Sequence, residues 1–314
     1  MVEGVFMGLA RNALLWISEN RKLRQALPNY KFIRKAVSRF MPGEELVDAL
    51  RAAEELKPQS ISTVFTHLGE NVTDEDEARK DAGEYIDALR QIQRRGLDTQ
   101  VSVKLTHLGL DLNEKACIDN LIAIVSEAKS VGNLVWIDME QSYYADRTLD
   151  IYKKVRKEFP NVGLCLQAYL YRTARDLEEL LPYSPAIRFV KGAYKEPHSI
   201  AFKKKSDVDA NFFTLTTTLM QHVKTGSKVV VGTHDTKLIQ DIQDKAAQTG
   251  LSKKNCEFHL LYGIQSNEQL RLAREGYSIR VLISYGSFWF PWYVRRLAER
   301  PANVWFVMRN MLSS

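Results

Sequence analysis

Residues 186–194, Ala-Ile-Arg-Phe-Val-Lys-Gly-Ala-Tyr, join an apolar run to a polar turn. The run Ala186–Val190 lacks a strict alternation of apolar and polar residues, as expected of a parallel strand that is covered on both faces. Lys191, Gly192 and Tyr194 follow it directly. Chemically useful side chains behind a buried strand are typical of α/β folds, which carry their sites at the carboxyl ends of parallel strands.

The same pattern recurs along the chain from residue 58, where short runs of β-branched residues are followed by polar turns and amphipathic stretches. The predicted strands, each followed by a helix, are Ser60–Thr66, Gln100–Leu105, Leu134–Met139, Gly163–Tyr169, Ala186–Val190, Lys228–Thr233, Cys256–Leu261 and Ile279–Ser284. Eight β–α units over roughly 240 residues favour a closed (β/α)8 TIM barrel over an open doubly wound sheet. No Gly-x-Gly-x-x-Gly turn follows any strand, which argues against a dinucleotide-binding fold.

The barrel is predicted to be flanked by helices at both ends of the chain. Residues 1–55 have apolar positions at helical spacing and are predicted as an N-terminal helical arm. Residues 56–314 are predicted as the barrel with its C-terminal helices. Thr73 with Asp76 predicts the N-cap of the first barrel helix. The apolar residues 305–312 are expected to pack on the barrel, with contact to a membrane or partner as the alternative.

Composition narrows the class of protein. With 314 residues, 45% of them hydrophobic and 26% charged, the chain is expected to be a soluble protein with a sizeable core. The net charge of +6 comes without a nucleic-acid motif, and its tight basic run, Lys203-Lys204-Lys205, is expected in a solvated loop. Three scattered cysteines indicate a reducing compartment. We therefore expect a cytoplasmic protein, with peripheral contact at the inner membrane face left open.

Polar side chains follow every predicted strand, whereas the starts of the strands lack them. They are Thr66, His67 and Glu70; Lys104, Thr106 and His107; Asp138 and Glu140; Gln167 and Tyr169; Arg188, Lys191 and Tyr194; Thr233, His234 and Asp235; Tyr262; and Tyr285 with Gly286. Because the carboxyl ends of all barrel strands meet at one mouth, these residues predict a site there.

The first chemistry to weigh is a metal hydrolase. Its ligands would come from the residues that metals bind in such barrels, here His67, His107, His234, Asp138 and Glu140. However, no His-x-His pair ends the first strand, and nearby cations would repel a divalent ion: Lys104, Arg188, Lys191, Arg295 and Arg296. We therefore expect no metal.

Two further chemistries use the cations. A Schiff-base enzyme would use Lys191 or Lys104 as a desolvated amine. A bound organic cofactor would instead carry the electrons, while the protein supplies position and charge. In that case the adjacent Arg295 and Arg296 would clamp a carboxylate in paired hydrogen bonds. Gly192 either lets a planar ring lie against the mouth or makes a tight turn.

Several motifs, taken in order, resemble the proline dehydrogenase family of flavoenzymes. The resemblance covers about residues 60–303. Its motifs are Thr66-His67-Leu68-Gly69-Glu70-Asn71-Val72, Val101-Ser102-Val103-Lys104-Leu105-Thr106, Ile137-Asp138-Met139-Glu140, Leu166-Gln167-Ala168-Tyr169-Leu170, Arg188-Phe189-Val190-Lys191-Gly192-Ala193-Tyr194, Thr233-His234-Asp235, Glu257-Phe258-His259-Leu260-Leu261-Tyr262-Gly263 and the segment 285–303.

The resemblance implies a TIM barrel that binds FAD at its C-terminal mouth, with the final helix capping that mouth. Its implied catalytic residues are Asp138 and Arg188. Its implied substrate-binding residues are Lys104, Tyr194, Leu261, Leu282, Trp292, Arg295 and Arg296. Its implied FAD-binding residues are Met139, Gln167, Arg188, Val190, Lys191, Gly192, Ala193, Thr233, His234 and Glu299. Glu70 would gate the closed site by pairing with an arginine of the last helix.

In terms of that family, a hydride leaves C5 of L-proline for flavin N5. The C–N bond is oxidised to an imine of the 1-pyrroline-5-carboxylate type, and electrons then pass to a quinone or another acceptor. The alternatives from a different class are the Schiff-base barrel and a barrel that binds a ligand without catalysis. The retained charged residues of the mouth argue against loss of catalysis, because such residues are costly to bury together.

The chain departs from the family pattern around the substrate. Leu282 and Trp292 stand where the family usually has tyrosines, and His259 stands where glutamine is usual. These changes remove hydroxyl groups and add bulk at Trp292. The expected substrate is therefore L-proline or a related cyclic or N-substituted amino acid. A free amino acid and one bound to a carrier or peptide stay alternatives.

Overall fold

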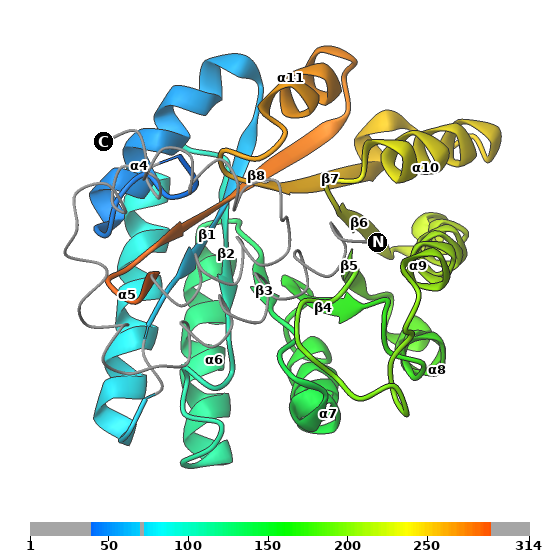
Figure 1. Cartoon of the computed structure of the whole chain (residues 1–314). Helices are drawn as coiled ribbons and strands as arrows, with labels where there is room; N and C mark the ends of the chain where they lie inside the picture. Colours follow the sequence, from blue (N-terminus) through cyan, green and yellow to red (C-terminus); the bar gives the residue numbers. More distant parts are fainter. Residues whose placement is uncertain (1–38, 70–71, 290–314) are drawn as a thin grey trace, which may run out of the picture.

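The computed structural model describes residues 39–69 and 72–289 (Figure 1). Its parallel strands form a closed barrel in chain order, β1 to β8. They are β1 Ser62–His67, β2 Thr99–Val103, β3 Val135–Ile137, β4 Val162–Gln167, β5 Ala186–Val190, β6 Lys228–Gly232, β7 Cys256–Leu261 and β8 Ser278–Tyr285. The predicted TIM barrel is confirmed, and each strand ends within two residues of its prediction.

Helices follow the strands and surround the barrel (Figure 1). They are α5 Glu75–Arg94, α6 Glu114–Ser130, α7 Ala145–Arg156, α8 Thr173–Leu180, α9 Lys205–Met220, α10 Thr236–Gln248 and α11 Ser266–Arg274. Short 3-10 turns adjoin some elements: η2 Lys57–Gln59, η3 Ser142–Tyr144, η4 Leu181–Tyr183, η5 Val223–Thr225 and η6 Lys253–Asn255. Within the described residues, no helix is long and apolar enough to cross a membrane.

The barrel has an outer and an inner core because side chains alternate along each strand. The outer core packs strands against helices and contains residues such as Phe189 and Phe212. The small inner cluster consists of Val64, Trp136, Ala186 and Val230, with Leu134 and Leu282 against it. The rest of the interior is polar, so charged side chains of β5, β7 and β8 need partners inside the barrel.

Before β1, α4 (Leu46–Leu56) packs against the barrel. Its buried residues, Ala49, Leu50, Ala52 and Ala53, share the outer core with the strands. The predicted boundary at residue 55 falls in the last turn of α4. The division into an arm and a barrel stays a prediction, because residues 1–38 lie outside the described residues.

The start of α5 differs by one residue from the predicted cap. Asp74 is the N-cap, and its side chain accepts a hydrogen bond from the Glu77 backbone N–H. The prediction of Thr73 as cap was wrong, because Thr73 instead donates its backbone N–H to the Glu77 carboxylate at 2.8 Å. Asp74 and Glu77 thus occupy the cap and N3 positions of a capping-box pattern.

Candidate active site

Arg188 and Asp138 meet inside the barrel. The Arg188 guanidinium reaches from β5 to the Asp138 carboxylate, which follows β3, and forms an ion pair through Nη2. Ser102 on β2 completes the group: its Oγ donates to Asp138 Oδ1 at 2.9 Å and accepts from Arg188 Nη2 at 2.9 Å. The structure therefore brings together the two residues predicted as catalytic, and Ser102 joins them.

The charge of Arg188 is maintained by this contact. Burial lowers the pKa of Arg188, but the Asp138 carboxylate and Cys165 outweigh burial and hold the pKa above its ordinary value. The side chain of Arg188 is 4% exposed, whereas that of Asp138 is 20% exposed. Asp138 is thus the member of the pair that lies closer to solvent.

Gln167, at the end of β4, is anchored beside this pair. Its Nε2 donates to the backbone carbonyls of Met139 and Glu140, each at 3.1 Å. Its Oε1 is buried and has no hydrogen-bond partner among the described residues. The same holds for Nη1 of Arg188 within those ranges. Unpaired polar atoms in the interior are costly, so these two indicate a place for a polar ligand.

Lys191 belongs to a cluster of alternating charges. Its Nζ pairs with Asp209 and, at 2.9 Å, with Asp235, and Lys205 pairs with the same two carboxylates. Burial alone would raise the pKa of Asp235, but hydrogen bonds from Lys191 and Lys205 hold it well below its usual range. Lys203 and Lys204 are exposed and lie before α9, as predicted for a solvated loop, whereas Lys205 is exposed and is the first residue of α9.

Gly192 follows Lys191 and has a backbone conformation that residues with a Cβ atom rarely adopt. Its φ is +114°, and the Tyr169 ring packs directly against it. Ala168 and Tyr169 donate their backbone N–H groups to the carbonyls of Val190 and Lys191. Ala193 is exposed and Tyr194 is half-buried. The β4 and β5 ends are therefore joined through their backbones.

His234 and Leu261 are in contact at the ends of β6 and β7. His234 Nε2 accepts the backbone N–H of Leu261 at 2.9 Å. An imidazole that accepts through Nε2 carries its proton on Nδ1 when neutral, which fixes the tautomer. Thr233 is buried, and its Oγ1 accepts the backbone N–H of Asp235 at 3.3 Å. Hydrogen bonds between backbone N–H groups and side chains therefore hold the residues that follow β6 close to the end of β7.

Glu140 and Lys104 lie near each other on the opposite part of the rim. Glu140 accepts two hydrogen bonds from Thr106, through the backbone N–H at 3.2 Å and through Oγ1 at 2.7 Å. Burial raises the pKa of Glu140, while Thr106 and the charge of Lys104 act in the opposite direction. Through Thr106, Glu140 thus holds the segment after β2 that also carries Lys104.

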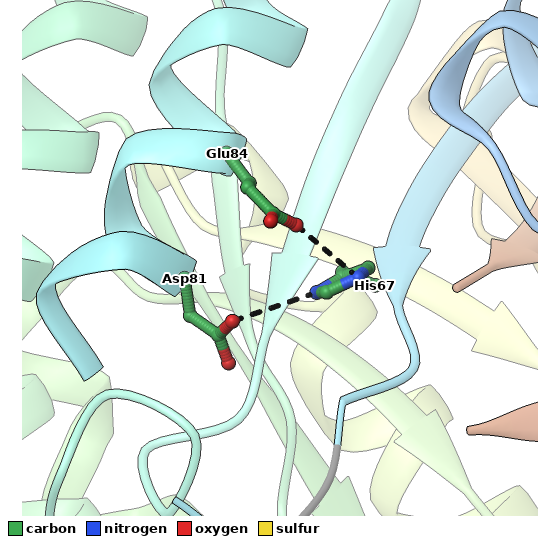
Figure 2. A group of neighbouring side chains, drawn as sticks. All are labelled: His67, Asp81 and Glu84. Carbon is green, nitrogen blue, oxygen red and sulfur yellow. Dashed lines mark ion pairs between the residues drawn. The ribbon is translucent and has the colours of Figure 1, made fainter. Parts of the chain in front are cut away.

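His67 lies between two carboxylates of α5 (Figure 2). Its Nδ1 is 3.9 Å from Asp81 and its Nε2 is 3.2 Å from Glu84. Burial raises the pKa of Asp81 to about 6, helped by Glu84. The carboxylates face different ring nitrogens, and only one nitrogen of an imidazole can bind a given ion. Burial lowers the pKa of His67 as well, so we interpret the group as a polar cluster rather than a metal site.

The departures from the family pattern that fall in the described ranges lie inside the barrel. Leu282 on β8 is in register with Val64 and Leu261 and packs against the inner cluster. His259 on β7 bonds Glu257 at 2.8 Å.

A cavity of about 400 Å³ opens near Asp98, Gln100, Asn133 and Arg280. It lies at the amino ends of β2 and β3, so it is at the opposite end of the barrel from the mouth.

Several predicted residues lie outside the described residues: Glu70, Trp292, Arg295, Arg296 and Glu299. Other residues of the site were missed. Ser102 lies in one of the family motifs but was not predicted as a site residue, and no contact of Lys205 or Asp209 with Lys191 was predicted. The spacing of Lys205 and Asp209, four residues apart on a helix, is the signal that could have revealed that pair.

Comparison with known proteins agrees with the motifs. The family model described as proline dehydrogenase matches residues 49–309. The chain belongs to the proline dehydrogenase family. This family comprises flavin-dependent oxidoreductases, so the chain is an enzyme of that class. Proline dehydrogenase 1 of Bacillus subtilis subsp. natto is 36% identical over 304 residues, which cover 97% of this chain and 99% of that protein.

Other relatives give the same result. The proline dehydrogenase of Deinococcus radiodurans is 35% identical over 309 residues, covering 97% of this chain and 98% of that protein. Among solved structures, proline utilization A from Bdellovibrio bacteriovorus, inactivated by N-propargylglycine, superposes with a TM-score of 0.77 at 20% identity. That match covers 91% of this chain but only 38% of that larger protein, so it supports the fold alone.

Proposed function

We propose that the protein oxidises L-proline, or a related cyclic or N-substituted amino acid, to the corresponding imine with FAD as cofactor. The observation that carries the proposal is the Arg188–Asp138–Ser102 group, which lies inside a TIM barrel of this family with Asp138 directly after β3. Enzymes of this fold carry their chemistry at the carboxyl ends of the strands, where this group lies.

The residues present fit a flavin. The buried Gln167 Oε1 and Arg188 Nη1 lack partners among the described residues, and a polar ring system could pair with both. We assign FAD binding to Met139, Gln167, Arg188, Val190, Lys191, Gly192, Ala193, Thr233, His234 and Glu299. When bound, a flavin supplies a two-electron oxidation by accepting a hydride from the substrate carbon next to nitrogen.

The remaining residues would hold the substrate. Lys104, Arg295 and Arg296 supply positive charge for its carboxylate. Leu261, Leu282, Tyr194 and Trp292 would form the wall around its ring. Asp138 would keep the Arg188 guanidinium in place at the reacting region, and Glu70 would close the site. A quinone or another electron acceptor is the proposed second substrate.

The geometry does not favour the Schiff-base alternative at Lys191. A Schiff-base lysine needs a nucleophilic amine, whereas Lys191 Nζ is engaged by Asp209 and Asp235. A barrel that merely binds a ligand would not need the Arg188–Asp138 ion pair, because the burial of Arg188 is costly.

The test is a steady-state assay with a soluble quinone as acceptor. L-proline, its six-membered ring homologue and N-methyl-L-proline would be compared, and the cyclic imine from proline would be trapped with o-aminobenzaldehyde. We expect quinone reduction and, with L-proline, stoichiometric trapped imine. Absence of quinone reduction with all three substrates, in protein that contains FAD, would rule out the proposal.

A further inference from the structure

Trp136 contacts Arg188 inside the barrel. It lies on β3 two residues before Asp138, so both side chains point inward from the same strand. The Arg188 Cζ lies over the indole, 5.2 Å from the ring centroid. Trp136 is fully buried and Arg188 nearly so. A guanidinium over an indole face is attracted by the ring quadrupole, and the attraction grows when water is excluded.

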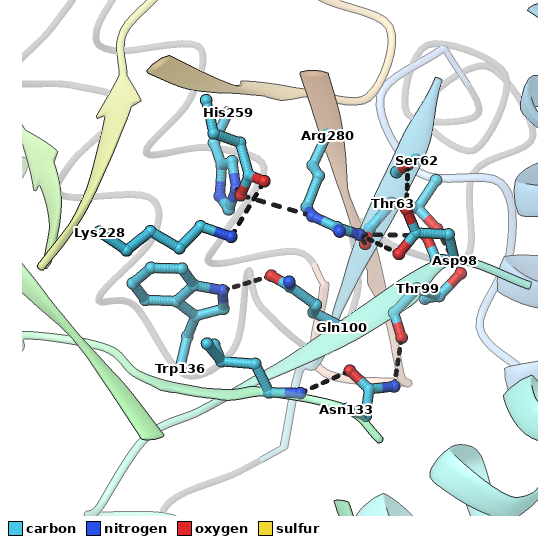
Figure 3. A network of polar contacts seen from close by, with 12 residues as sticks. Ser62, Thr63, Asp98, Thr99, Gln100, Asn133, Trp136, Lys228, His259 and Arg280 are labelled. Atoms are coloured by element: carbon cyan, nitrogen blue, oxygen red, sulfur yellow. Dashed lines mark hydrogen bonds and ion pairs between the residues drawn. The ribbon is translucent and has the colours of Figure 1, made fainter. Parts of the chain in front are cut away.

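Neighbouring strands determine the orientation of the indole. Its Nε1–H donates to Gln100 Oε1 at 2.7 Å, as Figure 3 shows. The His259 ring meets it edge-on, with centroids 5.6 Å apart. Gly163 on β4 leaves the space for it, because a Cβ there would lie 2.6 Å from the indole Cε3 and Cζ3 atoms. β2, β4 and β7 therefore all constrain the plane of one ring.

His259 is itself fixed by a second set of charges. Its Nε2 bonds Glu257, which also pairs with Lys228 at 3.0 Å and with Arg280 at 3.4 Å. Arg280 continues to Asp98 at 2.8 Å. This network lies on the side of Trp136 away from the mouth. Through His259, these ion pairs restrict the movement of the indole ring.

We propose that Trp136 is a positioning residue for the reaction, which fixes the Arg188 guanidinium so that Nη2 meets Asp138 and Ser102. The inference rests on the proposed function, in which Arg188 lies at the reacting region. Arg188 has a long side chain with many rotamers, and its ion pair holds only one end of the guanidinium. The indole face restricts the remaining freedom. Trp136 acts through Arg188 rather than on the substrate.

Trp136 could instead matter only as filler of the inner core. The contrast is Phe212 on α9, which is equally buried but lies in the outer core between strands and helices. Truncating either residue removes apolar volume and lowers stability. Only truncation of Trp136 removes the contact with Arg188.

The experiment compares FAD-loaded Trp136→Leu, Trp136→Phe, Gly163→Ala and Phe212→Leu. We expect Trp136→Leu to slow substrate-dependent flavin reduction about tenfold, which corresponds to about 1.4 kcal/mol in the barrier. In Trp136→Phe the rate of flavin reduction should stay within about threefold of the wild-type rate, because a phenyl face still attracts a guanidinium. Gly163→Ala should act in the same direction as Trp136→Leu, because its methyl group displaces the indole.

Two readouts separate positioning from loss of packing. The flavin reduction potential should change in Trp136→Leu and Gly163→Ala but not in Phe212→Leu, even where all three melt at lower temperature. The Nε–H proton of Arg188, identified by the NMR signal that is lost in Arg188→Lys, should exchange with water faster in Trp136→Leu and at the wild-type rate in Phe212→Leu. The exchange rate reports how firmly the guanidinium is held and needs no flavin.

An unchanged Arg188 exchange rate in Trp136→Leu would overturn the inference. Faster exchange with a reduction rate and a potential that match those of Phe212→Leu would also overturn it. Wild-type protein that takes up no FAD would remove the proposed function and with it the role of Trp136 in the reaction, whereas the exchange rates would still test the contact between Trp136 and Arg188.

Discussion

The Tyr169 ring lies against the backbone of Gly192 so closely that a Cβ atom at residue 192 would come within 2.1 Å of the ring Cδ1. This contact joins the residues just after β4 and β5 at the rim of the barrel. Gly192 also has a φ of +114°, a conformation that residues with a Cβ rarely adopt. The chain itself therefore requires glycine there, whatever ligand binds beside it.

Gly192→Ala should lower the free energy of unfolding by roughly 3 kcal/mol, because backbone strain and a steric clash add together. Gly132→Ala is the control. Gly132 also has a positive φ, +68°, but apart from Gly132 and its two chain neighbours no heavy atom of the described residues lies within 4 Å of the point that an added methyl group would occupy. It should lose only about 1 kcal/mol. Urea unfolding measures both, and equal losses would contradict the contact with Tyr169.

Asp138→Ala should destabilise the protein by about 3 kcal/mol, because it leaves Arg188 as an uncompensated buried charge. Arg188→Met should lower the free energy of unfolding less, since the Asp138 side chain is 20% exposed and water can solvate its charge. The double variant Asp138→Ala with Arg188→Met should be more stable than Asp138→Ala alone. A double-mutant cycle in urea tests this order. The pair is not coupled as described if Asp138→Ala proves the milder single change.

The pKa of Asp81 predicts how stability depends on pH. Burial, with Glu84, raises this pKa from 3.8 to about 6, so between these values the folded state binds the extra proton. The contribution of Asp81 to stability therefore falls as pH rises from about 4 to 6, by about 2 kcal/mol. The free energy of unfolding of Asp81→Asn should not fall over this pH range, so the variant should become more stable relative to wild type as pH rises from about 4 to 6.

Asp87→Asn is the matched control for this effect, because Asp87 lies exposed on the same helix α5. Its unfolding free energy should follow that of wild type at each pH. Urea unfolding at pH 4.5 and pH 7 gives the comparison. If the curves of Asp81→Asn and wild type run parallel, the burial of the Asp81 carboxylate does not act as stated.

Leu282→Tyr tests whether the altered wall changes substrate preference. Leu282 packs against the inner cluster at the register of Leu261. A tyrosine there restores the hydroxyl usual in the family and should raise kcat/KM for L-proline about threefold to tenfold, the effect of about one hydrogen bond. Leu282→Phe, which has the ring without the hydroxyl, is the control. Wild-type turnover of free L-proline at the level of other family members would contradict the altered-wall hypothesis.

The barrel could be predicted from sequence because eight apolar runs recur with polar turns behind them, and the register of each run sets which residues reach the mouth. Arg188 and Asp138 were both predicted at the mouth for this reason, whereas their catalytic roles came from the family resemblance, and the two residues are in contact. Trp136 was not singled out, since an aromatic residue within an apolar strand looks like ordinary core. Its contact with Arg188 depends on strands distant in the chain. The cluster around Lys191 was missed for the same reason, because Asp209 and Asp235 lie on separate β–α units.

The most direct test of the proposed function is the visible absorption spectrum of the purified protein, recorded before and after anaerobic addition of L-proline. We predict the absorption bands of bound flavin, with the long-wavelength band bleached by L-proline or, failing that, by an N-substituted or larger cyclic amino acid. A protein that stays colourless after incubation with FAD would contradict the assignment of the Arg188–Asp138 mouth as a flavin site.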